Sequence, residues 1–158
     1  MITAWRIVKA RYAANTFAGE GARQYSGRWN SIGTPMVYTS DYLATAVLEL
    51  IVNMAGHSAL FNKYRRIAVD IPARLITALD PKKLPADWQD NPPPASTRMI
   101  GDHWIQSQTS AVFKVPSAIL PQHHSYLLNP LHADFAEINI GKPHPFAFDP
   151  RISSVKMR

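Results

Sequence analysis

The sequence contains no cysteine, and few of its residues carry a charge. The absence of cysteine excludes disulfide bonds and metal sites built on thiolates. Charged residues make up 18% of the 158 residues and hydrophobic residues 46%, a balance that is not typical of a disordered chain. We therefore expect a single domain, spanning residues 1–158, with a hydrophobic core.

Long apolar runs are also missing. The longest, residues 44–55, is interrupted by Thr45, Glu49 and Asn53, and it is too short to cross a membrane. The segment Met1–Arg6 lacks the design of a secretory signal. These absences predict a cytoplasmic protein with no membrane-spanning segment.

Acidic residues are the minority charge, with 11 Asp and Glu against 17 Lys and Arg, which gives a net charge of +6. Such an excess can indicate nucleic-acid binding. The basic residues are scattered, however, and they form no long run or recognition motif. The charge equally suits a ligand that carries phosphate or an acidic protein partner.

Several familiar catalytic and metal motifs are absent. The sequence has no P-loop and no GxGxxG motif, and Ser117 follows Pro116 instead of standing in a GxSxG elbow. Without such a motif, Ser117 can be a turn hydroxyl that bonds to nearby backbone. His123 and His124 are adjacent, so on an extended segment they point to opposite faces and do not share one ion. We predict no metal site.

The hydrophobic pattern predicts many short strands and two helices. A helix is expected from Thr97, as its cap, to about Gln108, and residues 72–96 contain too many prolines for more than short turns. This count predicts an α+β fold with a mixed or antiparallel sheet. The strands are expected at Thr3–Val8, around Arg28, at Tyr38, at Tyr64–Ile71, Ala111–Val115, Ser125–Leu128, Phe135–Ile140 and Phe146–Asp149.

The other predicted helix follows Tyr38 and contains one lone carboxylate. Ser40 is its expected N-cap and Gly56 its expected end. Glu49 stands among aliphatic residues on a helix that is apolar on most faces, so a buried carboxylate needs a partner or a cleft. From the pattern alone, Glu49 either pairs with an arginine inside the fold or faces a polar pocket and acts on a ligand.

Taken in order, short motifs across nearly the whole chain resemble those of the RES domain. Each motif is weak alone, but their joint order and spacing are specific. The matching pieces are Trp5-Arg6-Ile7, Gly27-Arg28-Trp29-Asn30-Ser31 with Gly33, Val37-Tyr38-Thr39-Ser40, Leu48-Glu49-Leu50, Val115-Pro116-Ser117-Ala118 with Pro121, and Leu127-Leu128-Asn129-Pro130 with His132.

The resemblance implies a fold like that of ADP-ribosyltransferases and a toxin of a bacterial type II toxin–antitoxin pair that consumes NAD. It places Arg28, Tyr38, Glu49 and Ser117 at active-site positions, and it adds Arg6 and Asn129 as further motif positions that contact NAD. The residue types suit that substrate. Arginine binds pyrophosphate, tyrosine stacks on nicotinamide, and a carboxylate stabilises the oxocarbenium-like ribose formed when the nicotinamide bond breaks. Ser117 would add a hydrogen bond that positions the ligand.

We therefore expect an NAD glycohydrolase or phosphorylase, with a protein ADP-ribosyltransferase as the nearer alternative. A non-catalytic nucleic-acid-binding or interaction module is the alternative from another class. The resemblance further implies a hetero-oligomer with an Xre-like helix-turn-helix antitoxin, through which any contact with DNA would be made.

Overall fold

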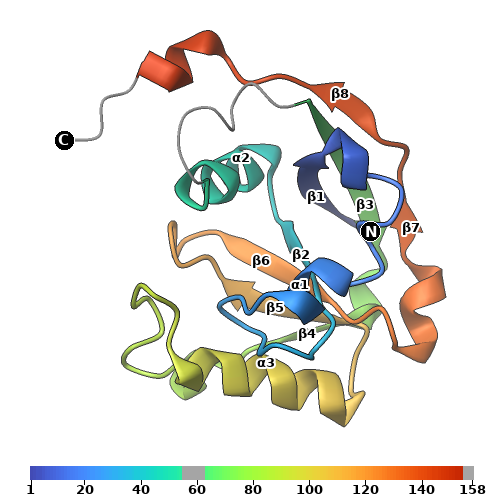
Figure 1. Cartoon of the computed structure of the whole chain (residues 1–158). Coiled ribbons are helices and arrows are strands. Elements are labelled where there is room, and N and C mark those ends of the chain that lie inside the picture. Colours follow the sequence, from blue (N-terminus) through green and yellow to red (C-terminus); the bar gives the residue numbers. More distant parts are fainter. Residues whose placement is uncertain (55–62, 155–158) are drawn as a thin grey trace.

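A curled, mixed β-sheet runs through the molecule, and two of the candidate site residues, Arg6 and Tyr38, lie on its strands (Figure 1). The computed structural model describes residues 1–54 and 63–154. Within these residues the strand order is β4-β5-β6-β2-β1-β3-β7, and β8 also pairs with β3. The strands are β1 (Ile2–Lys9), β2 (Val37–Ser40), β3 (Tyr64–Ile71), β4 (Ile76–Ala78), β5 (Val112–Pro116), β6 (His124–Leu128), β7 (Asn139–Ile140) and β8 (His144–Phe146).

The longest strand pair, β1 and β3, is antiparallel over its whole length, from Ile2 opposite Ile71 to Lys9 opposite Tyr64. In β3, Tyr64, Ile67, Val69 and Ile71 are buried, which follows the alternation in the sequence and confirms this strand. β4 runs parallel to β5, whereas the other described pairings are antiparallel. The predicted α+β class with a mixed sheet is confirmed.

The sheet divides between β1 and β2. These strands share one residue pair, Trp5 opposite Ser40, whereas β2 and β6 pair from Val37 opposite Leu128 to Ser40 opposite Ser125. Beyond Trp5 and Ser40, the facing backbone groups of β1 and β2 therefore need partners other than each other. One half of the sheet contains β1 and β3, and the other half contains β2, β6, β5 and β4.

The described residues form three α-helices, α1 (Glu20–Gln24), α2 (Leu43–Val52) and α3 (Ala95–Ser107), and the two longer ones pack on the sheet. α2 lies against β1 and β3, where Ala46 packs with Ile7 and Tyr64. α3 covers the other half of the sheet and packs Trp104 against Phe113, with ring centroids 5.3 Å apart. The two larger helices thus lie on separate parts of the molecule, one on each half of the sheet (Figure 1).

The helix boundaries differ from the prediction. Ser40 does not cap α2, because it is the last residue of β2 and Tyr42 occupies the N-cap, while Gly56 lies outside the described residues. α3 begins at Ala95 with Pro94 as its N-cap, three residues before the expected cap Thr97, and Thr97 donates from the first turn to the Pro94 carbonyl at 3.2 Å. The short helix α1 was missed because five residues in a segment rich in Ala and Gly carry no clear period.

Three strand predictions also need correction. Arg28 lies in a tight turn instead of a strand, since Gly27 donates to the Asn30 carbonyl at 3.0 Å. The segment Phe135–Ile140 is mostly a 3₁₀ turn, Ala133–Glu137, followed by the two residues of β7. The last strand, β8, ends at Phe146 instead of starting there, and the three-residue β4 inside the proline-rich segment was not predicted. No helix in the described residues is long and apolar enough to cross a membrane.

Candidate active site

Glu49 and Ser117 are in contact, although they are 68 positions apart in the chain. The Ser117 hydroxyl donates to the Glu49 carboxylate, with Oγ and Oε1 2.8 Å apart. Glu49 lies on α2, and Ser117 is the residue directly after β5. Among the described residues, Glu49 has no salt bridge, so the expected structural alternative, an arginine partner, is not what the fold provides.

Ser117 is buried, and its hydrogen-bonding capacity is used inside the protein. Its only proton goes to Glu49, and its oxygen accepts from the backbone N–H groups of Ile119 and Leu120 at 3.3 and 3.2 Å. A hydroxyl has one donor and two acceptor positions. The fold therefore uses Ser117 to orient Glu49 and to close the turn that follows, and its direct contact with a ligand stays a prediction.

α2 is more open than its sequence indicates. Glu49 is half-buried, and its neighbours Leu48 and Val52 are 38% and 56% exposed. The expectation of a carboxylate enclosed among aliphatic side chains is therefore wrong, because α2 packs on the sheet along one face only. Oε1 is fixed by Ser117, and Oε2 has no hydrogen-bond partner among the described residues.

Arg6 fills the division between β1 and β2. Its Nη1 donates to the Tyr38 carbonyl at 2.8 Å, and its Nε donates to the Thr16 hydroxyl at 2.7 Å. Burial lowers the pKa of the Arg6 guanidinium to about 10, which leaves it charged at neutral pH. Arg6 is thus a cation that points into the fold.

Tyr38 lies on β2 and uses its hydroxyl to hold the turn that contains Arg28. The hydroxyl donates to Asn30 Oδ1 at 2.6 Å and accepts from the Trp29 N–H at 3.1 Å. Burial, above all, raises the pKa of Tyr38, so it stays neutral and acts as a donor. A Cβ on Gly27 would lie 2.6 Å from this hydroxyl, so the turn needs a glycine there.

Arg28 is fixed by backbone carbonyls. Its Nη1 donates to Trp88 and Asp90 at 2.8 and 2.9 Å, in the loop that precedes α3. Within the described residues, Nη2 and Nε have no hydrogen-bond partner, so the other edge of the guanidinium is available for a ligand. The Arg28 turn is held further by α3, where Asp102 accepts from the Ser31 N–H at 2.9 Å.

Asn129 lies away from the Glu49–Ser117 pair. It follows the end of β6 that lies beside Val37, whereas Ser117 and Glu49 lie toward the opposite end, beyond Ser125. It is fully buried, and its Oδ1 accepts from the Leu131 N–H at 3.0 Å. These contacts suit a residue that shapes the following loop.

Sequence reasoning missed two residue groups that position the site. Asn30 is fully buried, and its amide donates to the Ala22 carbonyl at 2.6 Å while its Oδ1 accepts from Tyr38. Asp41 Oδ2 accepts from the His124 N–H and lies 3.0 Å from His123 Nδ1, which fixes the loop after Ser117 against the start of α2. The Asn30 position was part of a recognised motif, but nothing in the sequence linked Asp41 to His123.

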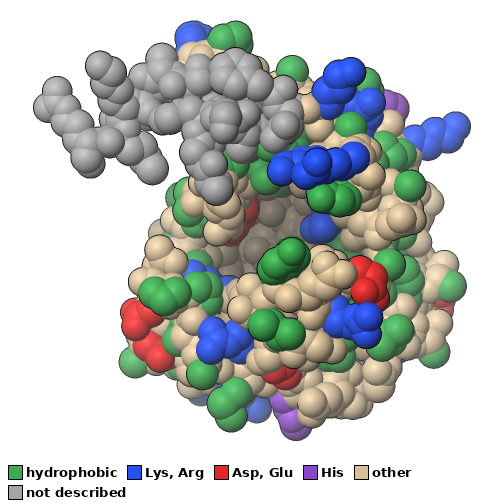
Figure 2. All heavy atoms as spheres, viewed as in Figure 1, with side chains coloured by type: hydrophobic (Ala, Val, Ile, Leu, Met, Phe, Trp, Pro, Cys, Tyr) green, Lys and Arg blue, Asp and Glu red, His purple; other side chains and the backbone are tan. Residues whose placement is uncertain are grey.

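The face that carries α2 is hollowed over β2, and both acidic and basic side chains are visible in the wall of the hollow (Figure 2). Glu49, Arg6 and Tyr38 belong to α2, β1 and β2, the elements that meet there. In the described part of the chain, no three His, Asp or Glu side chains gather in a way that could hold a metal ion.

Comparisons with known proteins give evidence that does not depend on the geometry of the site. The family model of the RES domain matches residues 3–149. "Toxin Res" of Yersinia enterocolitica (strain 8081) is 37% identical over 149 residues, which cover 94% of this chain and 97% of that protein. "Prs ADP-ribosylating toxin" of Sphingobium sp. (strain YBL2) is 33% identical over 153 residues, covering 94% of each chain.

A solved structure shares the fold. A chain of the crystal structure of the M. tuberculosis MbcT–MbcA toxin–antitoxin complex superposes with a TM-score of 0.76 at 18% sequence identity. The match covers 97% of this chain and 87% of that chain. At this identity, the likeness speaks for the fold alone.

Proposed function

This chain belongs to the RES domain family, as its motifs predicted, and on that premise we propose that it is a toxin that consumes NAD. The proposed reaction breaks the bond between the nicotinamide nitrogen and the ribose anomeric carbon. Nicotinamide leaves with the bonding electron pair, and an acceptor oxygen attacks the anomeric carbon and loses its proton. Loss of cellular NAD would arrest growth.

One observation carries the proposal: Glu49 is a half-exposed carboxylate with one oxygen fixed by Ser117 and the other without a partner in the described residues. The proposed bond cleavage builds positive charge on the ribose. A carboxylate held beforehand in one orientation stabilises that charge without reorganising during the reaction. Glu49 would also accept hydrogen bonds from the ribose hydroxyls.

The neighbouring residues suit the remaining parts of NAD. Arg28 has free guanidinium donors on the edge opposite its backbone carbonyl partners, which fits a pyrophosphate oxygen. The half-buried ring of Tyr38 offers a surface on which the nicotinamide can stack, since its hydroxyl is already engaged elsewhere. We assign Arg6 to the shape and positive charge of the cleft between β1 and β2, and Ser117 to the orientation of Glu49.

The acceptor divides the proposal into two reactions. Water or phosphate would make the protein an NAD glycohydrolase or phosphorylase, which we propose first. A protein acceptor would make it an ADP-ribosyltransferase, and the relative named "Prs ADP-ribosylating toxin", at 33% identity, favours that second candidate. The same Glu49 would serve both, because the step at the ribose is shared.

We further propose that an antitoxin forms a hetero-oligomer with this chain in the cytoplasm and covers the site. The relatives named "Toxin Res" and the fold shared with a chain of a toxin–antitoxin complex support a partner of this kind. A net charge of +6 would draw an acidic surface of that partner. An Xre-like helix-turn-helix partner, which the family resemblance implies, would supply the contact with DNA.

The test is NAD consumption by the purified, antitoxin-free protein, with phosphate and with a cell lysate as separate additions. Glu49→Gln removes the charge but keeps the size and the acceptor oxygen, so we expect NAD turnover to fall by about two orders of magnitude. Glu137→Gln is the matched control, because Glu137 is exposed and pairs with Arg74 on another part of the fold.

The products decide between the reactions. Free ADP-ribose or its phosphate ester supports the first reaction, and label from NAD on a protein supports the second. Full turnover by Glu49→Gln contradicts the role of Glu49. No turnover by the folded wild-type protein in any condition, together with strongly salt-dependent DNA binding, would favour the binding-module alternative instead.

A further inference from the structure

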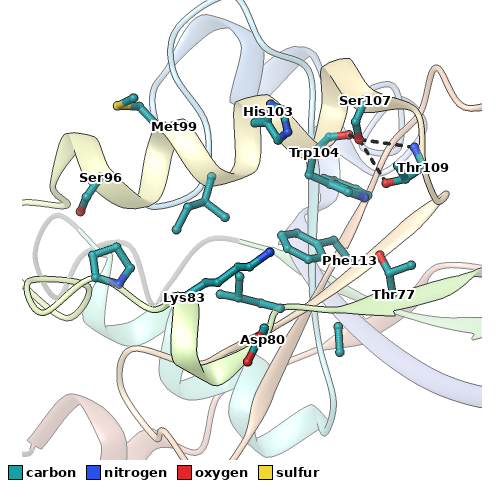
Figure 3. A pocket seen from close by; sticks show the side chains of 14 residues that line it. Thr77, Asp80, Lys83, Ser96, Met99, His103, Trp104, Ser107, Thr109 and Phe113 are labelled. Carbon is teal, nitrogen blue, oxygen red and sulfur yellow. Dashed lines mark hydrogen bonds between the residues drawn. The ribbon is translucent and has the colours of Figure 1, made fainter.

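We propose that this protein has a second ligand site, between α3 and β4, which binds a small aromatic anion. A pocket of about 750 Å³ lies there, with the 3₁₀ turn η4 (Pro81–Lys83) on one side and α3 on the other (Figure 3). This volume is within the range of pockets that enclose small organic molecules. None of the six predicted active-site residues lines it.

The floor of this pocket is aromatic and aliphatic. Trp104 and Phe113 stack on each other with their ring planes 22° apart, and Ile100 and Leu79 lie beside them. The Trp104 indole N–H is already satisfied by Ser110 at 2.9 Å, so the floor offers no free donor. Such a surface favours a flat apolar ring over a sugar or a polar chain.

The position of Lys83 favours an anion. Lys83 extends from η4 into the pocket toward the Phe113 ring (Figure 3), and in the described part of the chain its ammonium has no acceptor. Asp80, the acidic residue of the lining, accepts from the Lys82 backbone N–H at 3.0 Å and caps η4, and its side chain extends away from Lys83 and Phe113 (Figure 3). His103 contributes a second nitrogen-bearing side chain from α3. A carboxylate or sulfonate on the ring would therefore meet Lys83.

α3 separates this site from the Arg28 turn, and Glu49 lies on α2, which packs on the other half of the sheet. Gly101 and Asp102 face the Arg28 turn, where a Cβ on Gly101 would lie 1.6 Å from the Trp29 carbonyl oxygen. Met99, Ile100 and His103, on the adjoining positions of the same helix, line the pocket instead. The ligand inferred here is thus distinct from the proposed substrate, and the inference stands whether or not the protein consumes NAD.

Isothermal titration of the full chain with 2-naphthoate and with its neutral analogue 2-naphthamide tests the proposal. We expect naphthoate to bind more tightly than the amide. Lys83→Gln should weaken naphthoate binding roughly fivefold, as for an ion pair near the surface, and leave amide binding unchanged. Lys82→Gln is the matched control. It removes the same charge at the neighbouring position, and the Lys82 side chain does not line the pocket.

A second variant blocks the space. Ala78 lines the pocket from the edge strand β4 and is exposed, so Ala78→Phe should fill it without disturbing the core. We expect it to abolish naphthoate binding with an unchanged melting temperature. The proposal is overturned if the wild type binds neither ligand, if it binds both equally, or if Lys82→Gln weakens binding as much as Lys83→Gln does.

Discussion

Two charged residues of the proposed active site, Glu49 and Arg28, are held in different ways. Glu49 is oriented by one side-chain hydroxyl, that of Ser117. Arg28 is oriented by two backbone carbonyls, and its turn is held by Tyr38 and Asp102. The orientation of the Glu49 carboxylate depends on a single hydrogen bond, so removing one hydroxyl oxygen should change it. The Arg28 turn is disturbed only when the packing of α3 or its neighbouring loop changes.

The difference also concerns burial. Glu49 stands on a helix whose outer residues are exposed, so substitutions there should change chemistry more than stability. The Arg28 turn is bound to the fully buried Asn30 and to the tight contact between Gly101 and Trp29, so substitutions around it should change stability as well. Substitutions at the two places should therefore differ in how they divide between lost activity and lost stability.

The largest effect is expected from Gly101→Ala. Its new Cβ would lie 1.6 Å from the Trp29 carbonyl oxygen, so α3 must move away from the Arg28 turn. We expect a loss of about 3 kcal/mol in the free energy of unfolding, measured by urea denaturation. Gly21→Ala is the control, since a Cβ there meets no atom within 4 Å, and equal stability of both variants would contradict the packing described for α3.

Arg28→Ala should act on binding of NAD more than on the chemical step. The variant removes the free guanidinium edge and the bonds to Trp88 and Asp90. We expect KM for NAD to rise about thirtyfold with a smaller change in kcat, as for loss of a charge-assisted contact with phosphate. Arg23→Ala, which loses only an exposed pair with Glu20, serves as control. A fall in kcat at constant KM would assign Arg28 to the chemistry instead.

Ser117→Ala should act on the chemical step more than on binding of NAD. It leaves Glu49 in place but removes the proton that fixes Oε1, and we expect kcat to fall about tenfold with little change in KM. Stability should fall by about 1 kcal/mol, because the Ile119 and Leu120 N–H groups lose their acceptor. Ser125→Ala, a change at another buried serine, controls for the loss of a buried hydroxyl. An unchanged kcat would show that Glu49 does not need this orientation.

The smallest effect is a change in the alkaline stability profile. Folding raises the pKa of Tyr38 above its ordinary value of 10.0, so above about pH 10 the unfolded chain loses this proton while the folded protein keeps it. The stability that Tyr38 contributes through this shift is therefore present at neutral pH and is lost as pH rises beyond 10.

Tyr38→Phe should make this decline less steep, by about 1 kcal/mol per pH unit. Urea denaturation of both proteins between pH 9 and the onset of alkaline unfolding measures the slopes. Equal slopes would contradict the burial described for the Tyr38 hydroxyl. The lowered pKa of Arg6 has the opposite sign and affects both proteins alike, because above pH 10 the folded protein releases that proton first.

Much of this protein follows from local sequence. The alternation in Tyr64–Ile71 predicts β3 to the residue, because a strand with one buried face needs apolar side chains at every second position. The lone carboxylate of α2 marked Glu49, and the order of the RES motifs marked Arg6, Arg28, Tyr38 and Ser117 as candidates before any contact was known. The absence of long apolar runs and the many short strands set the fold class.

Tertiary structure decided which of these residues are in contact and through which atoms. It joined Ser117 to Glu49 across 68 residues, placed Asn129 toward the other end of β6, and converted the expected Arg28 strand into a turn held by the loop before α3. Composition and period report each residue's own preference for burial and backbone shape. A hydrogen bond between distant residues depends on where the whole sheet puts them, and no local pattern contains that information.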